Sequence, residues 1–183
     1  RQLRRQEVVT SEEAKDFSRA WRWILIGLAC FWATVATLVF PPAPRLVWNA
    51  SDSAPRGLYR VFPGIAPARG DMVIAWAPEP YRRLAAERHY LPANVPLVKR
   101  VAALAGDRVC ASGPAILVDD RVVAHRLAAD GSGRAMPWWR GCRNLRQSEY
   151  LLLMDAPASF DGRYFGLSRD ADLVGMARPL WTR

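Results

Sequence analysis

The chain of 183 residues carries 26 basic and 17 acidic side chains, a formal net charge of +9, and 51% of its residues are hydrophobic. This length and apolar content suffice for one folded domain with a core, and they exclude a largely disordered chain. The basic residues are spread along the sequence and form no recognition motif, so nucleic acid is not an expected partner. Anionic membrane lipid is the simpler partner for such a charge.

The first feature in chain order is an apolar stretch without charges, the 18 residues 23–40. As a helix it would extend about 27 Å, close to the roughly 30 Å of a hydrocarbon core. It could be a retained signal-anchor, a cleaved signal peptide or a buried core helix. The anchor is favoured, because signal-peptide apolar regions usually span only about 7–15 residues and a core helix would have a polar face.

Basic residues near this stretch predict its orientation. Lys15, Arg19 and Arg22 precede it, and only Arg45 follows closely. Because cytoplasmic flanks carry the excess of lysine and arginine, the N-terminus should be cytoplasmic. We expect a cytoplasmic tail over residues 1–22, a transmembrane segment over 23–40 and a domain outside over 45–183.

After residue 45, short apolar runs separated by Gly, Pro and Asp predict a mostly β domain. The strands are expected over residues 57–61, 71–76, 97–104, 108–111, 115–118, 121–124, 150–154 and 173–177. One amphipathic helix is expected over residues 80–89, beginning at a proline. Asp119 and Asp120 should form the tight turn between two strands.

The cysteines are compatible with an exported domain. Cys30 lies in the apolar stretch, whereas Cys110 and Cys142 remain as a candidate disulfide outside. Such a bond would close a loop of about 33 residues and stabilise the fold by roughly 3–4 kcal/mol. Two free buried thiols are the alternative. Metal is not expected, because His89 and His125 have no neighbouring residues at ligand spacing.

Lys99 is the only lysine after residue 40, and it lies in an apolar run that reads as a buried strand. Burial favours the neutral amine, so such a lysine can act as a general base, whereas arginine cannot. Upstream, Ser53 could be the matching nucleophile, with its own N–H and the Ser51 hydroxyl as oxyanion donors. The alternatives are a solvated surface lysine, or a serine paired with a histidine.

Three blocks of sequence carry a resemblance to a known family. They are NASDSAPRGLY at residues 49–59, VKRV at 98–101 with Gly106-Asp107, and SFDGRYFG at 159–166. In this order they resemble the type I signal peptidases of family S26, which use Ser-Lys dyads. The form of the first block, with Ala54 after the serine, is more similar to the TraF-type peptidases of conjugative transfer.

The resemblance implies a signal-peptidase/LexA-like β-fold catalytic domain after one N-terminal transmembrane helix. By it, Ser53 is the nucleophile, Lys99 the general base and Ser51 the hydroxyl donor to the oxyanion. Ser159 matches the serine that orients the lysine. Asp161 matches an acidic residue that supports the site, by pairing with Arg163 or Arg100, or it forms an ordinary structural salt bridge.

The implied activity is that of a serine endopeptidase anchored in a bacterial inner membrane, with its domain in the periplasm. Its expected substrate is a pilin-subunit precursor, which some systems close head to tail, and its expected partners are conjugation or type IV secretion components. No cofactor is expected, since the sequence has no phosphate-binding glycine loop. The alternatives are a general signal peptidase that removes leader peptides and a non-catalytic scaffold of a conjugation or secretion channel.

Overall fold

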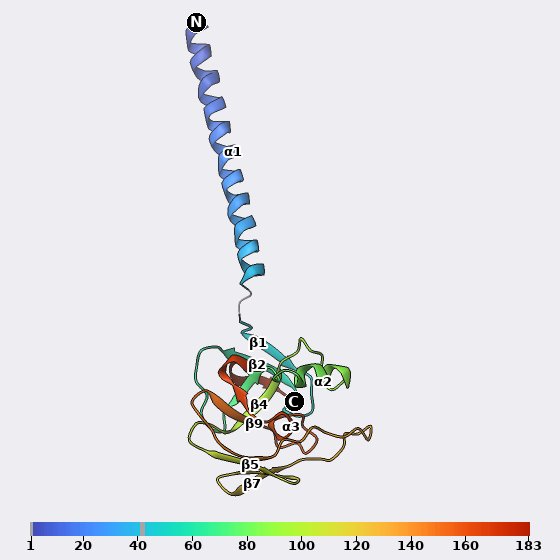
Figure 1. Ribbon diagram of the computed structural model, residues 1–183. Coiled ribbons are helices and arrows are strands. Elements are labelled where there is room, and N and C mark those ends of the chain that lie inside the picture. Colours follow the sequence, from blue (N-terminus) through green and yellow to red (C-terminus); the bar gives the residue numbers. More distant parts are fainter. Residues whose placement is uncertain (1, 41–42) are drawn as a thin grey trace. The chain divides into compact units, whose positions relative to one another are not determined.

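The computed structural model describes residues 2–40 and 43–183 of the chain (Figure 1). The chain divides after residue 42 into two compact units. The first contains the helix α1, Gln2–Val39. Within the described residues, Trp21–Val39 is the one segment long and apolar enough to cross a membrane, with a mean hydropathy of 1.7 and no part of it buried. An unburied apolar helix of this length suggests a membrane anchor.

The second unit is mostly β, as expected, and consists of two antiparallel sheets (Figure 1). The larger has seven strands in the order β1 (Leu46–Asn49), β2 (Gly57–Phe62), β11 (Leu173–Thr182), β3 (Met72–Ala75), β4 (Leu97–Ala103), β9 (Glu149–Leu153) and β10 (Ser168–Arg169). The smaller has four, in the order β7 (Arg121–His125), β6 (Ala115–Val118), β5 (Arg108–Ser112) and β8 (Gly141–Asn144).

The eight predicted strands are present as β2 to β7, β9 and β11, and the predicted helix is α2, Tyr81–Glu87. Asp119 and Asp120 both have positive φ, 47° and 63°, as a tight hairpin turn requires. The sequence prediction missed β1, β8, β10 and the short helix α3, Gly162–Phe165. All four residues of β8 are exposed, so this strand has no apolar alternation that a pattern could detect.

Strand β4 lies inside the larger sheet, between β3 and β9. One buried cluster joins these three strands through residues such as Val73, Val101 and Leu152. Another packs Ala54, from the loop between β1 and β2, into the core beside Val98. Because both segments are held by core packing, the loop and the middle of β4 keep a fixed relation to each other.

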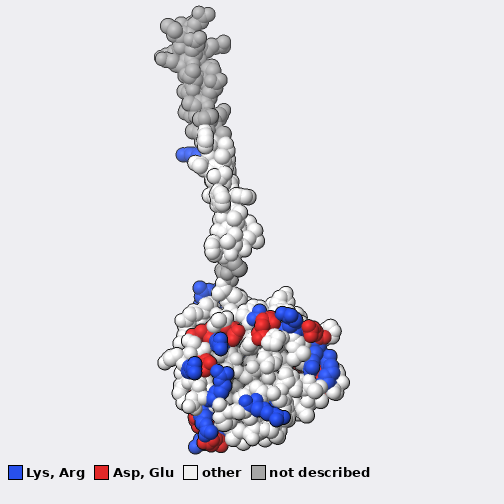
Figure 2. Space-filling view, in the orientation of Figure 1, with Lys and Arg blue, Asp and Glu red and all other residues white. Residues whose placement is uncertain are grey.

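Charged side chains are mixed on the surface of this unit. On the face shown in Figure 2, basic and acidic residues are interspersed rather than gathered by sign. Exposed ion pairs such as Arg56–Asp52 and Arg108–Asp120 accompany this arrangement. Each of these pairs neutralises an arginine charge locally.

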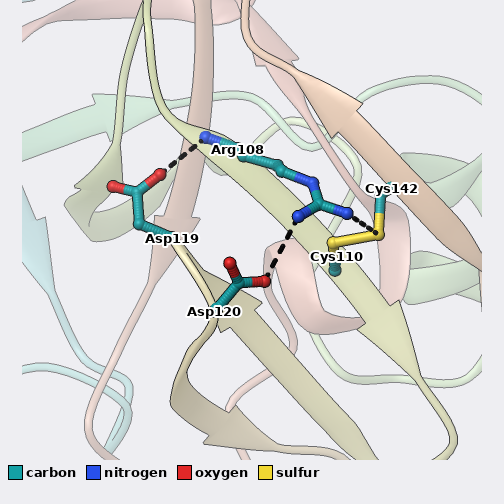
Figure 3. The surroundings of a disulfide bond; sticks show 5 residues. All are labelled: Arg108, Cys110, Asp119, Asp120 and Cys142. Carbon is teal, nitrogen blue, oxygen red and sulfur yellow. Dashed lines mark hydrogen bonds and ion pairs between the residues drawn. A yellow bond between two sulfur atoms is a disulfide. The ribbon is translucent and has the colours of Figure 1, made fainter.

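A disulfide joins Cys110 on β5 to Cys142 on β8, directly opposite in the antiparallel register, with Cα atoms 4.0 Å apart. Figure 3 shows Arg108 lying beside the bond. Its guanidinium donates to Cys142 Sγ at 3.7 Å and to an Asp120 carboxylate oxygen at 3.3 Å. The disulfide thus fastens β8, an exposed edge strand, to the rest of the smaller sheet.

Removing this bond should destabilise the domain. We expect the Cys110→Ala/Cys142→Ala variant to lose about 3–4 kcal/mol of unfolding free energy, because the two cysteines are separated by 32 positions and their link restricts the unfolded chain. Urea unfolding of the oxidised protein and the variant measures the difference. Cys30→Ser is the matched control, since Cys30 is a free cysteine, and an equal loss in the control would contradict the prediction.

Candidate active site

The loop between β1 and β2 carries Ser51 and Ser53, and its two ends meet where Asn49 pairs with Gly57. Gly57 has a φ of 150°, and a Cβ there would lie 2.0 Å from the carbonyl oxygen of Trp181. Only glycine allows this close approach of β2 to β11. The Tyr59 hydroxyl also donates to the Pro55 carbonyl at 2.7 Å, so the loop is fastened at its far end.

Lys99 reaches this loop from the middle of β4. Its side chain is 1% exposed. The Nζ atom lies 3.2 Å from Ser53 Oγ and 2.8 Å from Ser159 Oγ. The structure therefore brings three predicted residues into hydrogen-bond contact from three separate segments of the chain.

Burial lowers the pKa of the Lys99 amine from its ordinary value of 10.5 to about 8. The Asp161 carboxylate opposes this by raising the pKa, and the Arg163 guanidinium lowers it further. Desolvation is the largest of these effects, because an ammonium loses more hydration than a neutral amine. A substantial neutral fraction is thus present just above neutral pH, as a general base requires.

Asp161 and Arg163 form a buried ion pair, 2.8 Å between Arg163 Nε and Asp161 Oδ1, with side chains 0% and 2% exposed. Asp161 is the N-cap of α3 and also accepts from the Met154 backbone N–H at 3.0 Å. Arg163 in turn donates to the carbonyls of Met154, Pro157 and His125. The pair therefore ties α3 to the end of β9 and to β7.

Arg100 does not join this cluster, which corrects one of the two pairings expected for Asp161. Its guanidinium lies 3.4 Å from Asp155, and both side chains are exposed. The reason is the alternation of a β-strand: Arg100 follows the buried Lys99, so it points to the opposite face of the sheet.

Ser51 lies beside Ser53, with the two Oγ atoms 3.1 Å apart. The Ser51 hydroxyl also lies 2.8 Å from Oδ1 of Asn49, a buried residue to which the sequence prediction gave no role. The sequence contained a signal for this contact, because the side chain of an asparagine commonly accepts a hydrogen bond from the backbone N–H two residues later. Here that bond, from Ser51 N to Asn49 Oδ1, is 3.1 Å long.

The cluster opens into a cleft of about 670 Å³. Ser53, Lys99 and Ser159 line it together with apolar side chains, among them Leu91, Val95, Leu127 and Phe160. A cavity of this size, lined mostly by apolar side chains with a few polar groups, suits a ligand with apolar parts. Neither His89 nor His125 is among the lining residues. Within the described part of the chain, no group of three or more metal-ligand side chains occurs.

Part of the cleft wall is held by an ionic cluster that the sequence did not indicate. Tyr90 donates its hydroxyl to Asp130, and Arg134 Nε donates to the same carboxylate at 2.7 Å. The Tyr90 hydroxyl, and then the Arg134 contacts, hold the pKa of Asp130 well below its ordinary range. The segment that carries Asp130 is also held to the end of α2, where Arg88 donates to the Ala135 carbonyl at 2.9 Å.

Comparison with known proteins finds clear similarities. A model of the family "signal peptidase, peptidase S26" matches residues 18–181. The conjugal transfer protein TraF of Agrobacterium fabrum is 34% identical over 144 residues, 73% of this chain and 81% of the relative. A probable conjugal transfer protein TraF of Sinorhizobium fredii is 33% identical over 171 residues, 87% and 89% of the two chains.

A plasmid transfer protein TraF of Escherichia coli is 30% identical over 146 residues, 73% of this chain and 81% of the relative. Among solved structures, a signal peptidase I of Enterococcus faecalis aligns with a TM-score of 0.36 and 18% sequence identity. That alignment covers 61% of this chain and 97% of the solved one.

Breaking the buried ion pair should destabilise the domain far more than breaking an exposed one. We expect Asp161→Ala to lower the unfolding free energy by about 3–5 kcal/mol, because Arg163 is left buried without a counter-charge. Asp155→Ala is the matched control and should change it by less than about 1 kcal/mol, because its pair with Arg100 is solvated. Chemical denaturation of both variants measures this, and equal losses would contradict the assignment.

Proposed function

Because the chain belongs to the signal peptidase family, peptidase S26, and is similar to TraF conjugal transfer proteins, we propose that it is a membrane-anchored serine endopeptidase with a Ser53–Lys99 dyad. The observation that carries the proposal is the contact between the buried Lys99 amine and Ser53 Oγ at 3.2 Å. A lysine with a pKa of about 8 beside a serine hydroxyl is suited to remove its proton.

The geometry suggests how each group acts. Ser53 Oγ attacks the scissile carbonyl carbon while its proton passes to Lys99 Nζ. The negative charge on the carbonyl oxygen is stabilised by the Ser53 backbone N–H and the Ser51 hydroxyl. The intermediate then expels the amine, which takes the proton from Lys99 and leaves an ester on Ser53. Ser159 Oγ, 2.8 Å from Lys99 Nζ, holds the lysine side chain in place during both steps.

The second half-reaction decides the product. Water activated by Lys99 would hydrolyse the ester and give a linear product. An amine held near the ester would instead form a new amide, because proximity can replace the need for any additional catalytic group. Closure of a subunit into a ring therefore requires only that the N-terminal amine of the same subunit reaches the Ser53 ester before water does.

The family and the apolar helix support a membrane setting. Residues 1–22 would be a cytoplasmic tail, 23–40 a single transmembrane segment and 45–183 a periplasmic domain at a bacterial inner membrane. The TraF relatives are named for conjugal or plasmid transfer, which supports a pilin-subunit precursor as substrate and a conjugation apparatus as partner. A peptidase placed at the membrane meets its precursors as they emerge from the bilayer.

The dyad is tested by processing of a co-expressed pilin precursor, followed by intact mass. Ser53→Ala and Lys99→Ala should each reduce processing by about 10³-fold or more, because the two residues act as a unit. A mass lower by one water than that of the linear product would identify a ring.

Control variants separate chemistry from folding. Ser112→Ala, an exposed serine on β5, and the histidine variants His89→Gln and His125→Gln should all retain processing. Processing that persists in folded Ser53→Ala or Lys99→Ala protein would point instead to the scaffold. Efficient cleavage of ordinary secretory precursors would favour a general signal peptidase.

The activity should rise with pH. The base must be neutral, and below a pKa of about 8 the neutral fraction of Lys99 falls tenfold for each pH unit. We therefore expect kcat/KM to increase about tenfold from pH 6 to 7 and to level off above about pH 9. Circular dichroism over the same range checks that the fold is unchanged, and a flat profile from pH 6 to 9 would rule out Lys99 as the base.

A further inference from the structure

Asn49 makes hydrogen bonds with every polar atom of its side chain inside the loop between β1 and β2, residues 50–56, which we call the nucleophile loop. It is the last residue of β1 and is 6% exposed. Its amide nitrogen donates toward the carbonyls of Ser51, Ala54 and Pro55 at 3.1, 3.0 and 3.1 Å. Its amide oxygen accepts from the backbone N–H and the hydroxyl of Ser51. Every polar atom of the side chain is thus directed into the loop that carries Ser53.

These contacts determine which way the Ser51 hydroxyl points. The three carbonyls can only accept, so they fix the amide nitrogen of Asn49 on their side and its oxygen on the side of Ser51. Because Asn49 Oδ1 carries no hydrogen, the single proton of Ser51 Oγ must be donated to it across 2.8 Å. Ser51 therefore presents only lone pairs to Ser53 in this state.

The direction of that proton matters for both serines. Ser53 Oγ lies 3.1 Å from Ser51 Oγ and accepts from Lys99 Nζ at 3.2 Å, and once Lys99 is neutral its lone pair can accept the Ser53 proton instead. If Ser51 is to donate to the oxyanion, its proton must leave Asn49 and turn toward the substrate. The two orientations differ by rotation about one side-chain bond, which is fast compared with turnover.

We propose that Asn49 is a positioning residue that acts through Ser51. Its amide nitrogen holds the loop, and its amide oxygen holds the Ser51 hydroxyl in a resting orientation from which it turns to the oxyanion during acylation. This inference rests on the proposed function and extends it with a residue that sets when and where the oxyanion donor is available.

A purely structural role predicts something different. If Asn49 only fastened the loop, a substitution would displace Ser53 whether or not Ser51 had a hydroxyl. If Asn49 acts through the hydroxyl, part of the effect must vanish once that hydroxyl is gone. The two roles are therefore separated by a double-mutant cycle between Asn49 and Ser51, measured on kcat.

The experiment compares Asn49→Asp in the wild-type and Ser51→Ala backgrounds, in the full-length protein in detergent or lipid, with the pilin precursor as substrate. The carboxylate keeps the acceptor but holds the Ser51 proton more strongly, because charge-assisted hydrogen bonds are about twice as strong. We expect kcat to fall about tenfold more in the wild-type background than in Ser51→Ala, with KM changed by less than about twofold.

Asn49→Ala serves as a second variant in case the carboxylate prevents folding; it removes the acceptor for Ser51, so its effect on kcat should also differ between the two backgrounds. Thermal unfolding confirms that each protein is folded. Asn144→Asp is the matched control, since Asn144 is exposed on β8, and it should leave kcat and KM unchanged.

Equal losses in the two backgrounds, or no loss in either, would overturn the inference. Ser53→Ala is measured in parallel so that the two levels can be told apart. If Ser53→Ala is inactive and the Asn49 variants lose equal activity in both backgrounds, the proposed function stands and only the positioning role of Asn49 is refuted. Processing by Ser53→Ala would remove the proposed function, and this inference with it.

Discussion

The buried ion pair between Asp161 and Arg163 is the interaction on which the cluster depends. Two charges that are almost fully removed from water are stable only when every hydrogen-bonding group is satisfied. Here the backbone supplies those partners: the carboxylate accepts from Met154 N, and the guanidinium donates to three carbonyls, two that follow β9 and one on β7. The requirement to satisfy the pair fixes the course of the chain from β9 into α3, and so places Ser159 at Lys99.

The same pair sets the electrostatics of the lysine. Burial of Lys99 favours the neutral amine, whereas the Asp161 carboxylate favours the ammonium. Arg163 offsets part of the effect of the carboxylate, and desolvation, the largest cause, lowers the pKa to about 8. Lys99 is 1% exposed, and its amine meets the cleft only beside Ser53 and Ser159.

The nucleophile loop is also held in a fixed geometry, by strand pairing, a close backbone contact and side-chain hydrogen bonds. Its ends are brought together by the pairing of Asn49 with Gly57, and the bare backbone of Gly57 allows β11 to pack closely. Inside the loop, the Asn49 amide nitrogen donates to the carbonyls of Ala54 and Pro55, and the Pro55 carbonyl also accepts from the Tyr59 hydroxyl. Packing, backbone contact and side-chain hydrogen bonds together leave the loop little freedom beyond rotation of its hydroxyl groups.

The sequence alone indicated the mostly β character, the apolar helix and the family. It also singled out Ser53, Lys99, Ser51, Ser159, Asp161 and Arg163, because a lone lysine in an apolar run and three ordered motifs are local signals. It did not reveal β8 or α3, whose residues lack a periodic apolar pattern, or that Arg100 turns away from Asp161 to Asp155. Only the tertiary structure decided these matters, since strand register, the face on which a side chain lies and the partner of a buried charge depend on contacts between segments far apart in the chain. The role of Asn49 belongs to the same category: its residue type suggested a turn, but its contacts with the two serines required the folded loop.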